Sequence, residues 1–197
     1  CEAGEAGGNC LSPVQLQAAQ RVYDGFVLDG EQIFPGYPPG AELGLGGWTL
    51  WITGGFDVTD DSEFQRGVEP DPDYPDPETP NAHFAFGNGV MRYLVFHDPA
   101  WDYSTYDFST FWSDIAVVSS TLDASDPNLD AFRARGGKLL LYNGWRDMAL
   151  TPLGTIKYYE EVLDRDATAA DDVRLIMVPG MDHCFGGPGA TFVNCDD

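Results

Sequence analysis

The sequence predicts an α/β fold for its C-terminal part, and three segments carry this prediction. Two short apolar runs, residues 139–141 and 175–178, have the length and continuity of buried parallel strands. Between them, residues 152–163 carry apolar side chains at helical spacing. A strand, a helix and a second strand in this order form one α/β unit, whose strands end at a common edge of the sheet.

The rest of the chain predicts fewer regular elements. Ser12 is a good N-cap and Pro13 suits the first helical position, so we expect a helix over residues 14–24 that stops at Gly25. Prolines and glycines are frequent in residues 34–55, where residues 48–52 are the one stretch that could be a short strand or a helical turn. Asp107 is placed to cap a helix that runs to about residue 119.

Residues 57–78 are rich in acidic residues and proline, which predicts an extended, solvated loop. Its Asp71, Asp73 and Asp76 suggest a calcium loop, but prolines interrupt the turn and the glycine of an EF-hand is missing. Cys184 and Cys195 also have no Cys-x-x-Cys neighbour, and their surroundings lack the paired His and Cys residues that a zinc site requires. We therefore predict no metal and no cofactor in this chain.

Asp147 and His183 each follow one of the two predicted strands. Catalytic groups collect at the carboxyl edge of an open α/β sheet, and an Asp followed by a His suits the last two members of a Ser–Asp–His triad in α/β-hydrolase order. Asp147 could instead be a turn residue that caps the following helix. Asp182 is expected to face solvent, and His83 and His97, which lie among aromatic residues, are expected to have packing or surface roles.

The third triad member is not evident. No Gly-x-Ser-x-Gly sequence occurs in the 197 residues, and no serine follows a strand-like run into a helix. Either the triad interpretation is wrong, or the chain is the C-terminal portion of a longer enzyme.

Several motifs favour the longer enzyme. The segment Pro179-Gly-Met-Asp-His183-Cys184-Phe-Gly-Gly-Pro-Gly189 resembles the His-Cys signature of the tannase and feruloyl esterase family. Residues 129–147 are similar to the segment with that family's catalytic aspartate. Ser12-Pro-Val-Gln, Phe34-Pro-Gly-Tyr-Pro-Pro-Gly40 and Asp98-Pro-Ala-Trp101 are similar to stretches of its lid. The resemblance covers nearly the whole chain.

This resemblance implies a secreted or periplasmic serine carboxylesterase. Residues 1–124 would be the C-terminal portion of a large, loop-rich lid domain, inserted into an α/β-hydrolase core whose C-terminal part is residues 125–197. The nucleophile would lie upstream in a Cys-Ser element, and that Cys would be the disulfide partner of Cys184. The family's lid calcium loop would also lie upstream, before the part matched by Cys1. Asn143 departs from the family pattern, which usually has His there.

The cysteines indicate the compartment in which the protein works, and the net charge limits the classes of partner that it can bind. Cys1 and Cys10 flank a Gly-rich loop that a small disulfide would close, which fits an oxidising compartment. A net charge of −22 makes nucleic acid and anionic membranes poor partners. It predicts either a protein adapted to high salt or an ordinary acidic secreted protein.

Residues 84–112 are the most aromatic stretch. Most of these rings are expected to form a core of the lid, while some, with Phe96 and Trp101 as candidates, would bind the flat ring of an aromatic or phenolic ester. The sequence thus predicts an esterase whose missing N-terminal part supplies the serine. The alternative is a non-catalytic acidic binding module that keeps the lid architecture, and a Gly-Cys-Ser-x-Gly upstream in the reading frame would favour the esterase.

Overall fold

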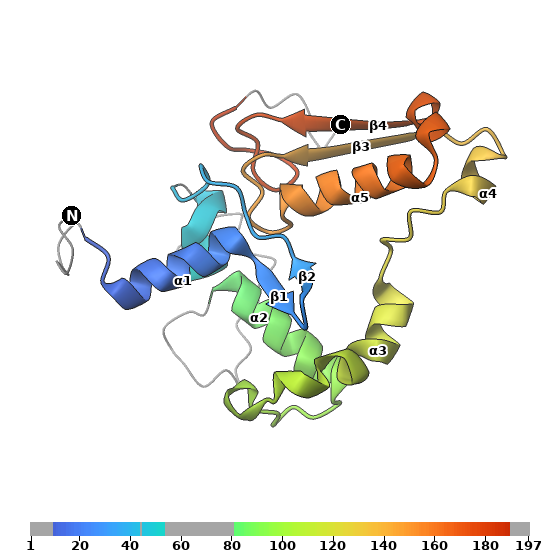
Figure 1. Ribbon diagram of the computed structural model, residues 1–197. Coiled ribbons are helices and arrows are strands. Elements are labelled where there is room, and N and C mark those ends of the chain that lie inside the picture. The colour runs from blue at the N-terminus through green and yellow to red at the C-terminus, as the bar shows by residue number, and fades with distance from the viewer. Residues whose placement is uncertain (1–9, 44, 54–80, 190–197) are drawn as a thin grey trace. The chain divides into compact units, whose positions relative to one another are not determined.

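The computed structural model describes residues 10–43, 45–53 and 81–189 (Figure 1). Contacts divide the chain into two compact units. The first joins the residues up to Glu42 with the residues from Pro127 onward, and the second comprises Leu43–Asp126. The sequence analysis instead placed the first 42 residues with the lid, and the assignment of residues 1–124 to a lid stays a prediction.

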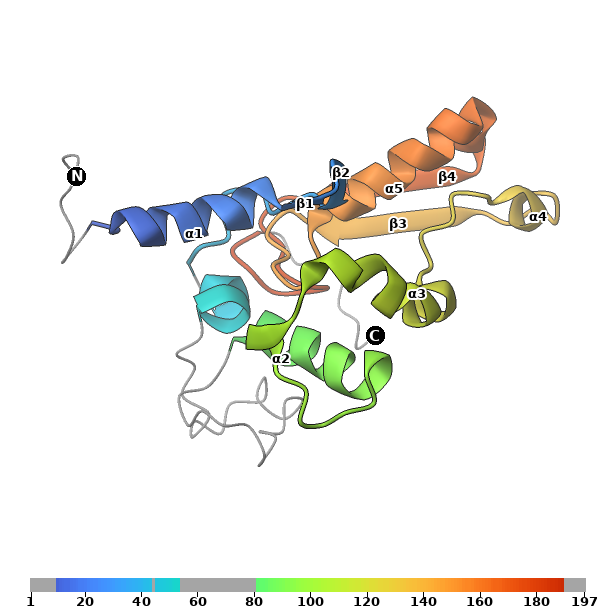
Figure 2. The same ribbon diagram turned by 60° about the horizontal axis from the view of Figure 1, so that its bottom comes forward.

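The first unit contains the predicted strand–helix–strand. Strands β3 (Leu139–Gly144) and β4 (Val173–Val178) pair in parallel, with Leu139 opposite Val173 and Gly144 opposite Val178. Helix α5 (Pro152–Arg165) connects them and runs alongside the sheet (Figure 2). These elements confirm the predicted strands and helix, with each strand extended beyond its apolar run.

One face of this sheet is buried and the other is not. The short helix η6 (Ala167–Asp171) precedes β4, and the buried core consists of Val162, Ala169 and Val173 with the side chains packed around them. The opposite face carries apolar side chains, Leu140, Tyr142 and Ile176, with exposed fractions of 61%, 40% and 42%. Parallel strands are normally covered on both faces, so this face is incompletely covered within the described residues.

The N-terminal helix α1 (Pro13–Asp24) begins as predicted. The Ser12 hydroxyl accepts a hydrogen bond from the Gln15 amide, and the Gln15 side chain accepts one from the Ser12 amide. This reciprocal capping satisfies two amide groups that would otherwise have no partner. The helix ends at Gly25, which takes a positive φ of 79°.

A hairpin that the sequence analysis did not predict follows this helix. Strands β1 (Phe26–Leu28) and β2 (Glu31–Phe34) pair antiparallel. Asp29 and Gly30 connect them with φ values of 52° and 85°, as a two-residue turn with both central residues at positive φ requires.

The second unit is helical in the part described. Residues Leu45–Thr53 form η1, which is kinked at Gly47, so the stretch predicted as a short strand or a helical turn is helical. Helix α2 (Ala82–Gly89) continues into η3 (Val90–Val95). The segments η4 (Tyr103–Thr105) and η5 (Phe108–Thr110) precede α3 (Phe111–Leu122). Asp107 caps η5 rather than α3, which is a small correction to the prediction.

Two further observations concern the described residues as a whole. None of their helices combines the length and the apolar character needed to cross a bilayer. They also include no group of three or more His, Cys, Asp or Glu side chains arranged to hold a metal ion. Residues 57–78, where the sequence analysis disfavoured a calcium loop, lie outside the described residues.

Candidate active site

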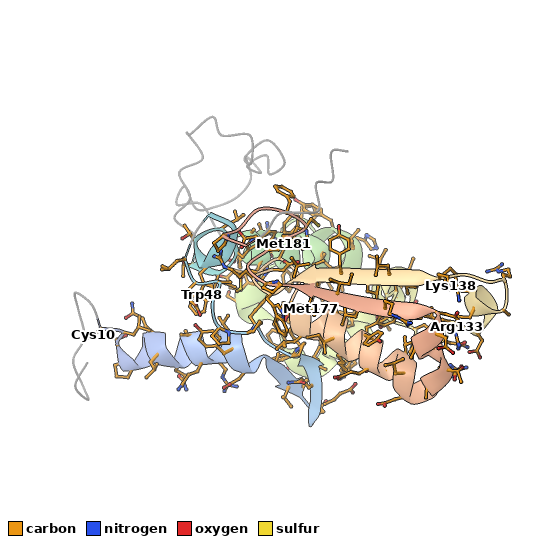
Figure 3. The ribbon with its side chains drawn as sticks, turned by 90° about the horizontal axis from the view of Figure 1, so that it is seen from above. Cys10, Trp48, Arg133, Lys138, Met177 and Met181 are labelled. Atoms are coloured by element: carbon orange, nitrogen blue, oxygen red, sulfur yellow. The ribbon has the colours of Figure 1, made fainter. Side chains whose placement is uncertain are left out.

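The two predicted site residues lie in loops at the carboxyl edge of the sheet. Asp147 lies in the loop after β3, residues 145–150, which we call the acid loop. His183 lies in the loop after β4, residues 179–187, which we call the base loop. Figure 3 shows Met181 of the base loop beyond this edge, while Arg133 and Lys138 lie at the opposite end of the strands.

Backbone hydrogen bonds extend the pairing of the strands into these loops. The Trp145 amide donates to the Val178 carbonyl over 3.0 Å, and the Arg146 amide donates to the Met181 carbonyl, also over 3.0 Å. A Cβ atom at Gly144 would lie 2.1 Å from the Met181 carbonyl oxygen. The absence of a side chain at this position therefore lets the two loops meet.

Asp147 is held by hydrogen bonds at both carboxylate oxygens. Oδ1 accepts from the amides of Ala149 and Leu150, each over 2.9 Å, and Oδ2 lies 2.9 Å from His183 Nδ1. Only 4% of the residue's surface is exposed. The two amide donors fix the orientation of the carboxylate, so that the second oxygen points at the imidazole.

His183 is the more exposed member of the pair. Its side chain is 38% exposed, whereas that of Asp147 is 5% exposed. A carboxylate acceptor at Nδ1 favours the tautomer with hydrogen on that nitrogen, which leaves Nε2 as the basic nitrogen. This is the arrangement of acid and base in a Ser–His–Asp triad. The structure thus brings together the two residues that the sequence analysis paired.

A strained turn follows the histidine. The Phe185 amide donates to the His183 carbonyl over 2.8 Å, and Cys184 between them has a positive φ of 63°. A three-residue turn of this hand is rare and strained for a residue other than glycine. Gly186 and Gly187 also have positive φ values. The base loop therefore turns sharply at the site, with Cys184 half-buried in the turn.

A third part of the site, which the sequence did not predict, comes from the N-terminal segment. The Thr151 hydroxyl, at the N-cap of α5, donates to the Gly36 carbonyl. The Tyr37 hydroxyl donates to the Ala149 carbonyl over 3.5 Å, and Arg146 Nε donates to the Gly40 carbonyl over 3.0 Å. Residues 36–40 therefore brace the acid loop. These contacts span more than 100 positions in sequence, so no local pattern could reveal them.

Tyr37 is a buried residue of this brace, with 5% of its surface exposed. Burial, together with the negative charge of Asp147, raises the pKa of the Tyr37 phenol well above its ordinary value. The phenol is therefore neutral at neutral pH. It contributes a neutral hydrogen-bond donor to the Ala149 carbonyl of the acid loop.

Asp182 was expected from the sequence to face solvent, and this expectation is wrong. Its side chain is 15% exposed, and its Oδ1 lies 3.5 Å from Arg146 Nη1. Burial raises the pKa of the Asp182 carboxyl, the Arg146 charge opposes this rise, and the Asp147 charge adds to it. The close approach of the base loop to the acid loop places Asp182 inside the site.

The other predicted site residues have simpler outcomes. Cys10 is disulfide-bonded, while Cys1, its expected partner, lies outside the described residues, so the Cys1–Cys10 link stays a prediction. Asn143 is buried, and its Nδ2 donates to the Thr155 hydroxyl over 2.8 Å.

Phe96 and Trp101 of the second unit stack on each other with their ring centres 5.4 Å apart, and their substrate-binding role stays a prediction.

The two histidines expected to have other roles lie in the second unit. The ring of His83 packs against Trp51 with their centres 5.4 Å apart, as expected for a packing role. His97 is exposed.

Comparison with known proteins decides the family. The profile described as "Tannase and feruloyl esterase" matches residues 1–196. The chain belongs to this family. The match confirms the resemblance on which the sequence analysis relied, and it includes the His-Cys segment and the residues of the acid loop.

Two curated relatives illustrate the range of the tannase and feruloyl esterase family. An uncharacterised esterase of Xanthomonas campestris is 31% identical over 92% of this chain. A mono(2-hydroxyethyl) terephthalate hydrolase of Piscinibacter sakaiensis is 32% identical over 94% of it. In both cases the chain spans about a third of the relative's length, 32%.

Two solved esterase structures share the fold. Feruloyl esterase B from Aspergillus oryzae superposes with a TM-score of 0.71 at 23% identity, over 97% of this chain and 34% of the other. An esterase from the same organism gives a TM-score of 0.69 at 21% identity, over 96% of this chain and 33% of the other. The chain therefore has the fold of about a third of these esterases, consistent with the predicted α/β-hydrolase-like fold.

Proposed function

We propose that the protein is a serine carboxylesterase of the tannase and feruloyl esterase type, which hydrolyses esters of phenolic or aromatic acids. The observation that carries the proposal is the hydrogen bond of 2.9 Å between Asp147 Oδ2 and His183 Nδ1. The nucleophilic serine comes from sequence outside this chain, since none of the serines lies in a Gly-x-Ser-x-Gly element.

The proposed mechanism follows from this geometry. Asp147 holds the hydrogen on Nδ1 and stabilises the imidazolium that forms during catalysis. His183 Nε2 takes the proton from the attacking serine and passes it to the leaving alcohol. Water then attacks the acyl-enzyme with the same base, which releases the acid and restores the serine. Because Asp147 Oδ1 already accepts two amide hydrogens, the carboxylate needs little reorganisation during these steps.

The uncovered face of the β3–β4 sheet supports the proposal that the nucleophile lies in a further part of the same core. Leu140, Tyr142 and Ile176 are exposed on that face. Burying a fully exposed apolar side chain of this size contributes roughly 1.5–3 kcal/mol, so covering these partly exposed side chains would contribute a fraction of that each. Two parallel strands form a very small sheet. In this proposal, the remaining core of the enzyme covers the exposed face and places the serine at the carboxyl edge.

The substrate class is proposed from the relatives and from the aromatic side chains. The named activities of the relatives concern feruloyl esters and a terephthalate monoester, whose acid parts are flat aromatic rings. The second unit, which we propose belongs to the lid, contains the stacked pair Phe96 and Trp101. Aromatic walls suit such rings. We further propose a secreted or periplasmic location, which the disulfide at Cys10 supports.

The test is turnover by the full-length protein. It should hydrolyse methyl ferulate or a related aromatic ester, and a serine-directed phosphonate should label a serine outside this chain. Asp147→Asn should lower kcat by about 10⁴-fold, the scale measured for tautomer loss in serine proteases, and His183→Ala should be at least as damaging. Asp164→Asn and His97→Ala, which change exposed residues of the same types, serve as matched controls and should retain activity.

Two results would contradict the proposal. Near-normal turnover in Asp147→Asn or His183→Ala would remove that residue from the mechanism. A folded full-length protein without activity on any aromatic ester would favour the alternative, a non-catalytic acidic binding module with the same architecture.

A further inference from the structure

A second pair of opposite charges lies beside the candidate triad residues. The side chains of Arg146 and Asp182 are only 14% and 15% exposed, and Arg146 Nη1 lies 3.5 Å from Asp182 Oδ1. Each residue directly precedes a candidate triad residue, Asp147 or His183, in sequence. The proposed mechanism makes no use of either of them.

Arg146 contacts three separate segments. Its backbone amide donates to the Met181 carbonyl of the base loop, and its Nε donates to the Gly40 carbonyl of the N-terminal segment. Its Nη1 reaches Asp182. The residue is therefore anchored on both sides of the guanidinium, and a side chain held at several points loses little further freedom when it forms an ion pair.

Asp182 depends on this arginine for charge compensation. Its Oδ1 is buried and has no hydrogen-bond donor among the described residues. The neighbouring charge of Asp147 is of the same sign and repels it. Glu42, which also lies close enough to interact with Arg146, adds a second carboxylate to the surroundings of the guanidinium. Arg146 therefore supplies a positive charge among these acidic groups.

We propose that Arg146 and Asp182 form a positioning pair that holds the base loop against the acid loop and thereby keeps His183 Nδ1 within hydrogen-bond distance of Asp147. The inference rests on the proposed function, since it assigns the pair a role in that catalytic arrangement. Neither residue touches the reacting atoms. Their effect passes through the backbone of Met181 and Asp182, which leads directly into His183.

The charge pair is suited to this task because it is partly buried. Removing one member of a buried pair leaves the other uncompensated, which is far more costly than losing an exposed pair. In this site, loss of either charge leaves a carboxylate or a guanidinium without its partner between two loops. We therefore expect the loops to separate, which would lengthen or break the hydrogen bond of His183.

The primary test observes the histidine directly, without any need for activity. In the full-length protein labelled with ¹⁵N-histidine, NMR should show a low-field Nδ1 proton that is absent from His183→Gln. Arg146→Gln and Asp182→Asn should each weaken this signal at least several-fold or move it upfield. The double variant should resemble the single ones, because the two side chains act as a unit. Arg146→Lys keeps the charge and should restore part of the signal.

An exposed ion pair of the same residue types provides the control. Arg165 and Asp130 are 2.7 Å apart with side chains 42% and 61% exposed. Arg165→Gln and Asp130→Asn should leave the His183 signal unchanged. If Arg146→Gln and Asp182→Asn also leave it unchanged while the proteins remain folded, the positioning role is wrong.

Kinetics provide the second arm. Arg146→Gln and Asp182→Asn should lower kcat roughly 10–100-fold with KM changed less than about twofold, since misplacing a catalytic group by about 1 Å costs on this scale. A change confined to KM or to thermal stability would overturn the proposal. A wild-type protein with the low-field signal but no ester hydrolysis would contradict the proposed function alone. Loss of the signal in the variants would then still support the pair.

Discussion

Gly144 and Met181 approach so closely that a Cβ atom on the glycine would lie 2.1 Å from the methionine carbonyl oxygen. Gly144 is the last residue of β3, and Met181 precedes Asp182 and His183 in the base loop. At this point the closest approach between the end of β3 and the base loop is between backbone atoms. Because backbone cannot move aside as a side chain can, the contact is intolerant of added volume.

Gly144→Ala should therefore both destabilise the protein and impair the site. We expect a loss of about 1–3 kcal/mol in the free energy of unfolding, as for other overpacked positions, and a fall in kcat of the full-length protein. Gly154→Ala in α5 is the matched control, since its nearest atom would be the Thr151 methyl group at 3.4 Å. That change should be neutral or slightly stabilising. Urea unfolding and turnover measure both effects, and equal behaviour of the two variants would contradict the close contact.

Thr151→Ala should weaken the brace of the acid loop. The hydroxyl accepts from the Leu153 amide at the start of α5 and donates to the Gly36 carbonyl. Its loss removes a helix cap and leaves a buried acceptor unsatisfied, so we expect a cost of about 1–3 kcal/mol in unfolding free energy. Thr151→Ser keeps both hydrogen bonds and should recover most of it. A Thr151→Ala protein as stable as wild type would show that the brace contributes nothing.

Stability in acid should depend on Asp166. Hydrogen bonds from Thr168 and Arg133 lower the pKa of its carboxyl from 3.8 to about 2. The folded protein therefore binds this proton less readily than the unfolded chain. The stabilisation of the folded state by ionised Asp166 is complete above the pKa in the unfolded chain, 3.8, and is lost as the pH falls through the pKa in the folded protein, about 2. Asp166→Asn should flatten the dependence of unfolding free energy on pH between these values, whereas Asp164→Asn, on an exposed residue of α5, should not. Parallel pH curves for Asp166→Asn and wild type would refute the assignment.

The net charge of −22 leads to a prediction about salt. If the acidic surface is an adaptation to high salt, the melting temperature should rise substantially between low ionic strength and molar NaCl. Screening over about 3 Å at 1 M removes most repulsion between exposed carboxylates. Differential scanning calorimetry at several NaCl concentrations measures the effect. A flat or falling melting temperature would favour an ordinary acidic secreted protein.

The parts of the fold that could be predicted from the sequence are those with strong local signals. The apolar runs of β3 and β4 and the apolar face of α5 are each visible in a short window, and Ser12 with Pro13 marks the start of α1. The hairpin of β1 and β2 was missed because its strands are short and largely exposed, so they lack an alternating pattern. Its turn did carry a signal, since Asp29-Gly30 is a favoured pair for a two-residue hairpin turn.

The site residues also fall into those that a local sequence signal predicts and those that it does not. Asp147 and His183 could be predicted because each follows a strand, and the parallel pairing of those strands brings them to one edge. The contributions of Tyr37 and Thr151 could not, because they depend on contacts between residues more than 100 positions apart. The error over Asp182 has a related cause. The expectation considered only its neighbour in sequence, whereas its burial results from the loop that lies across from it.

Cys184 occupies a backbone conformation that glycine would adopt without strain. For other residues a left-handed φ, here 63°, costs of order 1 kcal/mol. A sequence under selection for stability alone would place glycine between His183 and Phe185, as it does at the next two positions, Gly186 and Gly187. The cysteine is therefore held in a turn that glycine would form at a lower cost. Cys184→Gly relieves this strain, so a loss of stability or turnover in the full-length variant, beyond the entropy that glycine adds to the unfolded chain, measures what the sulfur contributes, including the disulfide that the family resemblance implies.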